Sequence, residues 1–286
     1  GDVYKRQRLG RFERNIDSPL ILGVVNLTPD SFSDGGLYSV SLKEALNYAE
    51  GLLKDGADIL DIGGESTRPG ALPVAPDEEW RRLKDFLCEV KNWGVPLSID
   101  THHSETMEKA LNLGAMDILN DIAALQEPGG IALMAQAAQV AIILMHMQGE
   151  PATMQQAPRY RHVVQEVEDF LWQRVHRAKK GGIDKNRFIL DPGIGFGKSV
   201  EHNLSLIKSL PYLKKRLPFP WLIGVSRKSV LGELLNESEP KARFAGSLIL
   251  ELAAISGGVQ FIRTHEVKLS CDALTVYQAL QAAPSL

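Results

Sequence analysis

The chain alternates between short apolar runs and longer stretches in which apolar residues recur every three or four positions. The longer pattern predicts amphipathic helices, for example over residues 41–57 and 162–183. The short runs are almost continuously apolar, which indicates strands buried on both faces, as in a parallel sheet covered by helices. Eight runs are expected to form strands: Leu20–Asn26, Asp58–Gly63, Pro96–Asp100, Asp117–Asn120, Val140–His146, Arg187–Asp191, Trp221–Ser226 and Val259–His265.

Eight strand-then-helix units in a chain of 286 residues favour a (β/α)8 TIM barrel, in the α/β class, as a single domain over residues 18–286. An open, doubly wound sheet is the alternative on pattern alone. Residues 1–17 are rich in Arg and Lys and show no apolar period. They are therefore predicted to be an N-terminal extension outside the core.

Composition and charge narrow the classes of function. A formal net charge of -3 offers no basic surface for nucleic acid. No apolar run reaches the roughly 18 residues of a membrane span, and the charged start does not suit a secretory signal. Cys88 and Cys271 lie far apart without metal-ligand or disulfide spacing, so both are interpreted as packing residues. We expect a cytoplasmic protein with no nucleic-acid or membrane partner.

Polar side chains stand where the predicted strands end. Asp191 shows this most clearly, because it follows an apolar run and precedes a proline and three glycines that end any strand or helix. In a (β/α)8 barrel the carboxyl ends of the strands build the catalytic face. The corresponding positions are Asn26, Asp61, Asp100, Asn120, His146, Asp191, residues 226–229, Arg263 and His265. A site drawing on nearly every unit is predicted, with Asp61 and His146 expected to support their neighbours.

These side chains suggest a flat heterocycle joined to a phosphate. Asp and Asn side chains together can accept from and donate to the ring nitrogens of such a heterocycle. The basic residues 227, 228, 263 and 265 suit a phosphate or pyrophosphate. Asn26 can help to hold Mg²⁺, which prefers oxygen ligands. Two long Gly-, Ser- and Pro-rich loops, Leu27–Val40 and Gly64–Pro76, are predicted to be lids or binding loops.

Eight motifs resemble, in order and spacing, the signatures of bacterial dihydropteroate synthases. They are NLTPDSFSDGG (26–36), GGESTRPGA (63–71), SIDT (98–101), NDI (120–122), LMHMQG (144–149), DPGIGFGK (191–198), SRKS (226–229) and RTHEV (263–267). The resemblance implies a transferase of folate biosynthesis, usually a homodimer, with Mg²⁺ as cofactor. It implies that (7,8-dihydropterin-6-yl)methyl diphosphate is joined to 4-aminobenzoate by an SN1-like mechanism, with release of pyrophosphate, and that sulfonamides act as mimics of 4-aminobenzoate.

The same resemblance assigns roles by position. It implies that the pterin is bound by Asp100, Asn120, Asp191 and Lys228. It places pyrophosphate against Asn26, Arg68, Arg263 and His265, with Asn26 as the metal ligand. The residues implied for the 4-aminobenzoate pocket are Thr67, Pro69, Phe196 and Ser229. Catalytic roles fall to Lys228, Asp100, Arg263 and His265.

The sequence departs from the family pattern at a few positions. Ile194 stands where Phe is common, Ala123 replaces a common Arg, and RTHE replaces RVHD. THHS at 101–104 replaces the frequent TSKP. Because adjacent residues at a strand end point different ways, His102 and His103 are expected to be solvated loop residues rather than metal ligands.

Three other functions stay open. A pterin-binding methyltransferase domain serving a corrinoid partner would share the barrel, but would not need Thr67, Arg68 or the SRKS run. A Schiff-base aldolase would use Lys228 with a depressed pKa, and borohydride trapping with a carbonyl substrate would reveal it. A non-catalytic pterin-binding protein would fail a product assay.

Overall fold

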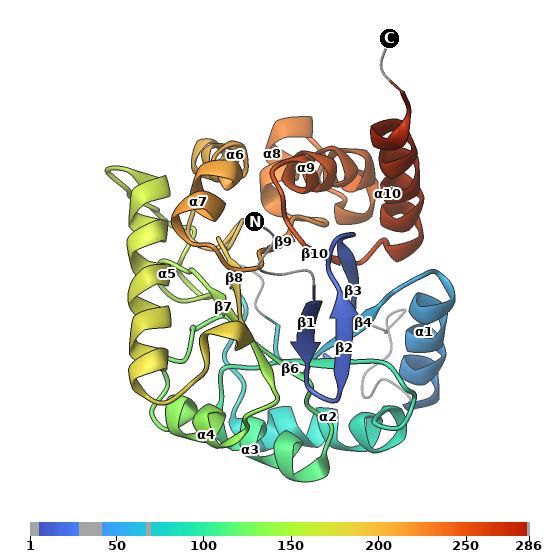
Figure 1. Cartoon of the computed structure of the whole chain (residues 1–286), viewed down its shortest axis with the longest axis vertical. Coiled ribbons are helices and arrows are strands. Elements are labelled where there is room, and N and C mark those ends of the chain that lie inside the picture. The colour runs from blue at the N-terminus through green and yellow to red at the C-terminus, as the bar shows by residue number, and fades with distance from the viewer. Residues whose placement is uncertain (1–5, 29–41, 67–69, 285–286) are drawn as a thin grey trace.

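The computed structural model describes residues 6–28, 42–66 and 70–284 and confirms the (β/α)8 barrel (Figure 1). The barrel strands are β3 (Leu20–Asn26), β4 (Ile59–Gly63), β5 (Leu97–Asp100), β6 (Ile118–Asp121), β7 (Ala141–Met145), β8 (Phe188–Asp191), β9 (Leu222–Gly224) and β10 (Phe261–Thr264). They pair in parallel in the order β8-β7-β6-β5-β4-β3-β10-β9. A parallel bridge between Leu190 and Trp221 joins the two ends of this sheet and closes the barrel.

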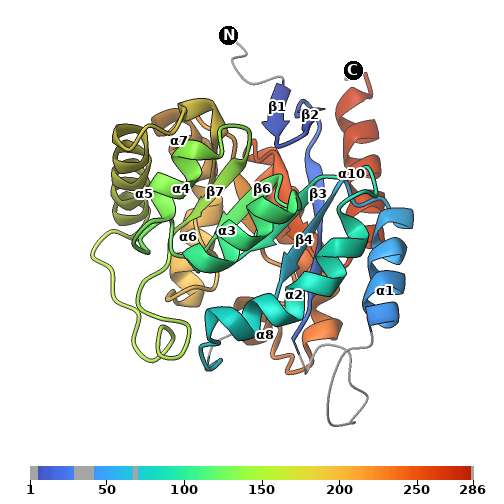
Figure 2. The same cartoon turned by 90° about the horizontal axis from the view of Figure 1, so that it is seen from below.

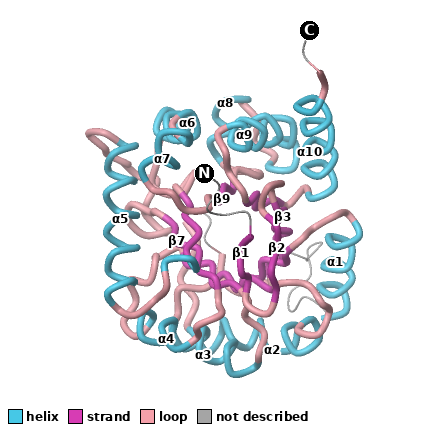
Figure 3. The backbone as a smooth tube through the Cα atoms, in the orientation of Figure 1, coloured by secondary structure: helices cyan, strands magenta, loops and turns pink. Residues whose placement is uncertain are grey.

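Helices form a ring around the strands (Figure 3). They are α1 (Leu42–Lys54), α2 (Pro76–Val90), α3 (Ser104–Leu113), α4 (Gly130–Gln136), α5 (Val163–Lys180), α6 (Val200–Lys208), α7 (Leu210–Arg216), α8 (Ser229–Leu235), α9 (Phe244–Ser256) and α10 (Val267–Ala282), with short 3₁₀ helices at Lys185–Arg187 and Pro240–Arg243. The two helices expected from periodicity correspond to α1 and α5. Within the described ranges, no helix is long and apolar enough to cross a membrane.

The alternation of side chains along each strand separates two cores. Residues such as Leu60, Ile99 and Leu119 face outward and pack against the helices. Their strand neighbours face inward, where Ile59, Ile118 and others fill the amino-terminal half of the barrel. Two positions further along, the same inward face carries polar residues. The apolar half of the barrel therefore forms the floor on which the polar residues of the carboxyl half rest.

A β-hairpin made of β1 (Arg6–Leu9) and β2 (Phe12–Asn15) covers the amino-terminal end of the barrel (Figure 2). The expectation that residues 1–17 lie outside the core is wrong for this hairpin. Leu9 is fully buried and belongs to the inward apolar cluster. Arg11 Nη2 pairs with the buried carboxylate of Asp117 at 2.8 Å. The hairpin closes the end of the barrel that lies opposite the strand-end polar residues.

Candidate active site

A buried arginine links two carboxylates at the carboxyl ends of the strands. Arg263 on β10 donates from Nε to Asp61 Oδ2 at 2.6 Å and from Nη2 to Asp100 Oδ2 at 2.9 Å. Asp61 is fully buried and also accepts from Asn120 Nδ2 at 3.2 Å. Burial lowers the pKa of Arg263, but the carboxylates of Asp61 and Asp100 outweigh it and hold that pKa above its ordinary value. Asp61 thus supports its neighbours, as predicted, and the network ties together β4, β5, β6 and β10.

Their surroundings raise the pKa values of the site carboxylates toward pH 7. Burial raises the pKa of Asp100 to about 7, although the charge of Arg263 opposes the shift. Burial likewise raises the pKa of Asp191 to about 6, opposed by the hydrogen bond from the Gly193 N–H and by nearby lysines. Perturbed carboxylates in a buried, polar strand-end cluster are a common mark of a functional site. They can accept hydrogen bonds from a ligand that replaces water.

The turn after Asp191 is fixed by glycine. Gly193 N–H donates to Asp191 Oδ1 at 2.7 Å, and Gly193 has a positive φ of +69°. A Cβ there would lie 1.8 Å from the carbonyl oxygen of His146. Only glycine allows the backbone to pass this close to the His146 carbonyl. The turn can therefore bring the Gly193 N–H to the Asp191 carboxylate and hold that carboxylate at the barrel mouth.

Lys198 is a buried residue beside the site, and the sequence analysis gave it no role. It is almost completely buried, and its Nζ donates to the carbonyl oxygens of Gly193 at 2.8 Å and Phe196 at 3.0 Å. It also lies 2.9 Å from Nδ1 of His146. Burial lowers the pKa of Lys198 to about 7 and, together with the charge of Lys198, that of His146 to about 3. Lys198 and His146 together support the turn from its buried side. In the sequence, only the position of Lys198 at the end of the GFGK motif pointed to this role.

Lys228 follows β9 and lies over an aromatic ring. Its Nζ is 3.9 Å from the centroid of Phe196, a cation–π contact. Burial and the charge of Arg263 lower the pKa of Lys228 to about 8, while Asp191 opposes the shift. Ser229 is the next residue and begins α8. The structure therefore brings Phe196, from the turn after β8, against Lys228, with Ser229 next to it along the chain.

His265, beyond β10, is oriented by Ser226. The Ser226 Oγ accepts from the backbone N–H of His265 at 3.2 Å and lies 3.1 Å from His265 Nδ1. Because the hydroxyl then donates to Nδ1, the ring hydrogen is assigned to Nε2, where it can be donated to an anion. Arg227 instead pairs with Glu266, from Nε at 2.7 Å and also from Nη2. It is therefore less suited to phosphate than the sequence suggested.

The remaining predicted residues fall in two groups. Asn26 ends β3 at the barrel mouth and is partly exposed. Thr67, Arg68 and Pro69 lie outside the described residues, as does most of the predicted loop Leu27–Val40.

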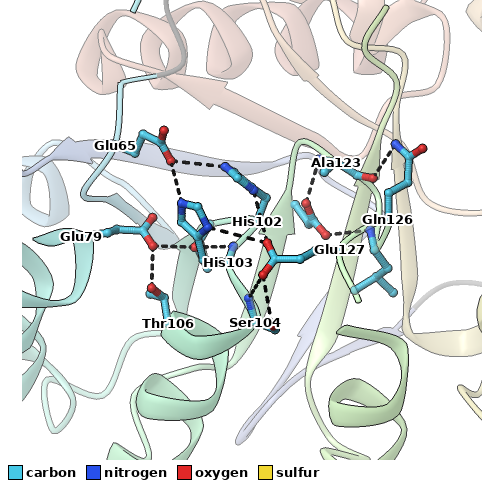
Figure 4. A network of polar contacts seen from close by, with 12 residues as sticks. Glu65, Glu79, His102, His103, Ser104, Thr106, Ala123, Gln126 and Glu127 are labelled. Carbon is cyan, nitrogen blue, oxygen red and sulfur yellow. Dashed lines mark hydrogen bonds and ion pairs between the residues drawn. The ribbon is translucent and has the colours of Figure 1, made fainter. Parts of the chain in front are cut away.

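The tandem histidines do not behave as predicted. Their ring centroids lie 3.9 Å apart, and Nε2 of each is 3.3 Å from Glu65 Oε2 (Figure 4). The cause is local, because the backbone N–H of His103 donates to Thr101 Oγ1 at 3.1 Å and turns the chain at the end of β5. Because β5 ends at Asp100, the two histidines no longer follow the alternation of side chains along a strand, and both rings can face the same way.

Comparisons with known proteins agree with the motifs. The family model described as pterin binding enzyme matches residues 22–265. The dihydropteroate synthase of Neisseria meningitidis serogroup B is 54% identical, with 95% of this chain and 96% of the relative covered. The Xanthomonas albilineans dihydropteroate synthase with 4-aminobenzoic acid superposes with a TM-score of 0.91 at 43% identity, covering 98% of this chain and 99% of the other. The same bacterium's enzyme in complex with 7,8-dihydropteroate gives 0.87 at 40% identity, covering 98% and 100%.

Proposed function

The chain belongs to the pterin-binding enzyme family, among its dihydropteroate synthases, and from this premise we propose how its barrel mouth joins (7,8-dihydropterin-6-yl)methyl diphosphate to 4-aminobenzoate. It is an enzyme of the transferase class. The observation that carries the proposal is the buried polar cluster of Asp100, Asn120 and Asp191 with two cationic side chains. The near-complete match to dihydropteroate synthases decides against the methyltransferase, aldolase and non-catalytic alternatives.

The pterin ring binds between the strand-end side chains. Asp191 and Asp100 offer carboxylate oxygens to ring N–H groups, and Asn120 both donates and accepts. Asn120 is held in place by Asp61, so its amide is oriented before the ring arrives. Lys228 is poised on Phe196 to donate to a ring oxygen or nitrogen. Each polar edge of the heterocycle therefore meets a buried group of complementary type.

The reaction exchanges one bond for another. The C–O bond of the pterin methylene breaks with its electron pair going to the diphosphate, and the electron-rich ring delocalises the positive charge. The amine nitrogen of 4-aminobenzoate then bonds to the methylene carbon and loses a proton. The carboxylates of Asp100 and Asp191 favour positive charge on the ring, while Arg263 and His265 offer N–H donors to the departing anion. No nucleophilic side chain is needed.

Mg²⁺ fits the residues at the end of β3. Asn26 offers a hard amide oxygen, and its side chain has no hydrogen-bond partner within the described ranges. Such an ion often takes only one or two protein ligands and completes its shell with water and phosphate oxygens. When bound, it would supply positive charge beside the leaving diphosphate.

A homodimer and a cytoplasmic location complete the proposal. Apolar side chains stay exposed on neighbouring helices of one side: Phe244 is 46% and Ile249 67% exposed on α9, and Val276 and Leu280 are each 69% exposed on α10. Large apolar side chains gathered on adjacent helices are typical of a protein interface. We assign this surface to the contact between two copies of the chain.

Product formation tests the function. The purified chain, incubated with the pterin diphosphate, 4-aminobenzoate and Mg²⁺, should release one pyrophosphate for each dihydropteroate formed. Omission of 4-aminobenzoate should abolish the dihydropteroate. A folded chain that binds the pterin and forms no product would overturn the proposal.

A further inference from the structure

Three metal-ligating side chains converge where β4 and β5 lead into their following connections. The Glu65 Oε2, His102 Nε2 and His103 Nε2 atoms all lie within 4.8 Å of one another. Both imidazoles are turned toward the Glu65 carboxylate (Figure 4). None of these three residues belongs to the pterin, 4-aminobenzoate or pyrophosphate subsites assigned above. The group therefore needs its own explanation.

The spacing of these atoms suits a tetrahedral metal ion. A zinc ion with bonds of about 2.0–2.1 Å separates its ligand atoms by about 3.3–3.4 Å. Glu65 Oε2 lies 3.3 Å from Nε2 of each histidine, which matches that separation. We propose that Glu65, His102 and His103 form a binding site for a first-row transition metal ion of the Zn²⁺ class. Two imidazoles and one carboxylate are a ligand set that such ions favour.

The Glu127 carboxylate lies on the Nδ1 side of both rings, opposite Glu65. Its Oε2 lies 3.5 Å from His102 Nδ1 and 3.6 Å from His103 Nδ1. Its Oε1 accepts from Ser104 N–H and from Ser104 Oγ, both at 3.0 Å, which fixes the carboxylate. A carboxylate on the non-ligating nitrogen is the usual outer support of a metal-bound histidine. Here one carboxylate serves both rings.

The charge around the rings also favours a divalent cation. Two imidazolium ions whose ring centroids are 3.9 Å apart would repel each other, whereas neutral rings sharing one metal ion would not. Glu65 and Glu127 flank the pair, and Glu79 and Asp121 also act on the rings electrostatically. The Val74 carbonyl oxygen lies 3.1 Å from His103 Nε2 and accepts its hydrogen when that nitrogen is protonated, a contact that a metal ion bound to Nε2 would replace. A divalent cation on the Nε2 side of the rings would balance part of this negative charge.

The site remains open to solvent while its ligands are largely enclosed. The side chain of His102 is 30% exposed, against 10% for Glu65 and 13% for His103. A hydrated ion can therefore enter past His102 and keep a water at an open position. Mg²⁺ is a poor competitor, because it prefers oxygen ligands to imidazole. The proposal is thus independent of the Mg²⁺ role assigned to Asn26 and of the proposed reaction.

Cobalt provides a spectroscopic probe of the site. Co²⁺ added to the metal-free full chain should develop the intense visible absorption of a tetrahedral ion at one equivalent, and Zn²⁺ should displace it while Mg²⁺ should not. His102→Ser, which introduces a residue common in the family, should weaken Zn²⁺ binding at least about 100-fold. Glu65→Gln should do the same, and it keeps the side-chain volume if the first variant folds poorly. His176→Gln, on the exposed face of α5, should bind as the unmodified chain does.

An outer-support variant sharpens the assignment. Glu127→Gln should weaken Zn²⁺ affinity about 10- to 100-fold, less than loss of a ligand. Zn²⁺ should also raise the melting temperature of the unmodified chain, but not that of His102→Ser. Co²⁺ without tetrahedral absorption, or equal Zn²⁺ affinity in the unmodified, His102→Ser and Glu65→Gln chains, would overturn the proposal.

Discussion

The most specific structural prediction concerns Asp61, because its proposed role is to hold Arg263 and Asn120 in place without contacting a ligand. Asp61→Asn leaves one oxygen and one NH₂ group where two oxygens now accept from Arg263 and from Asn120. Whichever way the amide turns, one donor faces another donor. Removing one partner of a buried ion pair costs about 3–5 kcal/mol, and we expect about 3 kcal/mol in the free energy of unfolding because Asp100 still pairs with Arg263. The loosened Asn120 should lower kcat/KM about 10- to 100-fold.

A matched control separates support of the site from stability alone. Asp117 is equally buried and paired with an arginine, but it lies at the amino end of β6, beside the hairpin. Asp117→Asn should lower stability in urea denaturation while leaving kcat/KM near that of the unmodified chain. Both variants are assayed well below their melting temperatures. If Asp61→Asn loses stability but keeps full kcat/KM, the network does not orient the pterin site.

Three further predictions follow from single contacts. Lys198→Met leaves the carbonyl oxygens of Gly193 and Phe196 without their buried donor, so urea denaturation should show a loss of about 2–4 kcal/mol; unchanged stability would show that Lys198 does not brace the turn. Pterin affinity should be highest between pH about 7, below which Asp100 and then Asp191, with its raised pKa of about 6, become protonated, and pH about 8, above which Lys228 loses its charge. Calorimetry from about pH 5 to about pH 9 checks this, and affinity that keeps rising as the pH falls contradicts it. Ile249→Lys should convert a dimer to a monomer by light scattering, whereas a monomeric unmodified chain would refute the assigned interface.

The barrel was predictable because its strands are buried on both faces. A run such as Phe188–Leu190 is apolar regardless of which side is inward, so it stands out in the sequence. The hairpin was not predictable, because its second strand is half exposed and carries only one large apolar residue among polar ones. Its burial depends on Leu9 and on the pairing of Arg11 with Asp117, a contact between positions 106 residues apart.

The site was predictable where its polar side chains lie at the carboxyl ends of strands. Asp100 and Asp191 end their strands, Asn120 is the last but one residue of β6, and the three converge because their strands run parallel in one barrel. Lys198 was missed because nothing local distinguishes it from a surface lysine; its partners are carbonyl oxygens brought close by the fold. His102 was misjudged because the Thr101 hydroxyl accepts a hydrogen bond from the backbone N–H of His103, which redirects the chain.

The central claim is that the buried strand-end carboxylates bind the pterin ring, and calorimetry on Asp191→Asn tests it most directly. The substitution replaces an acceptor by a donor facing the ring N–H groups, which should cost about 2–4 kcal/mol of pterin binding. Asp117→Asn should keep the affinity of the unmodified chain. A folded Asp191→Asn chain that binds the pterin as tightly as the unmodified chain would contradict the account.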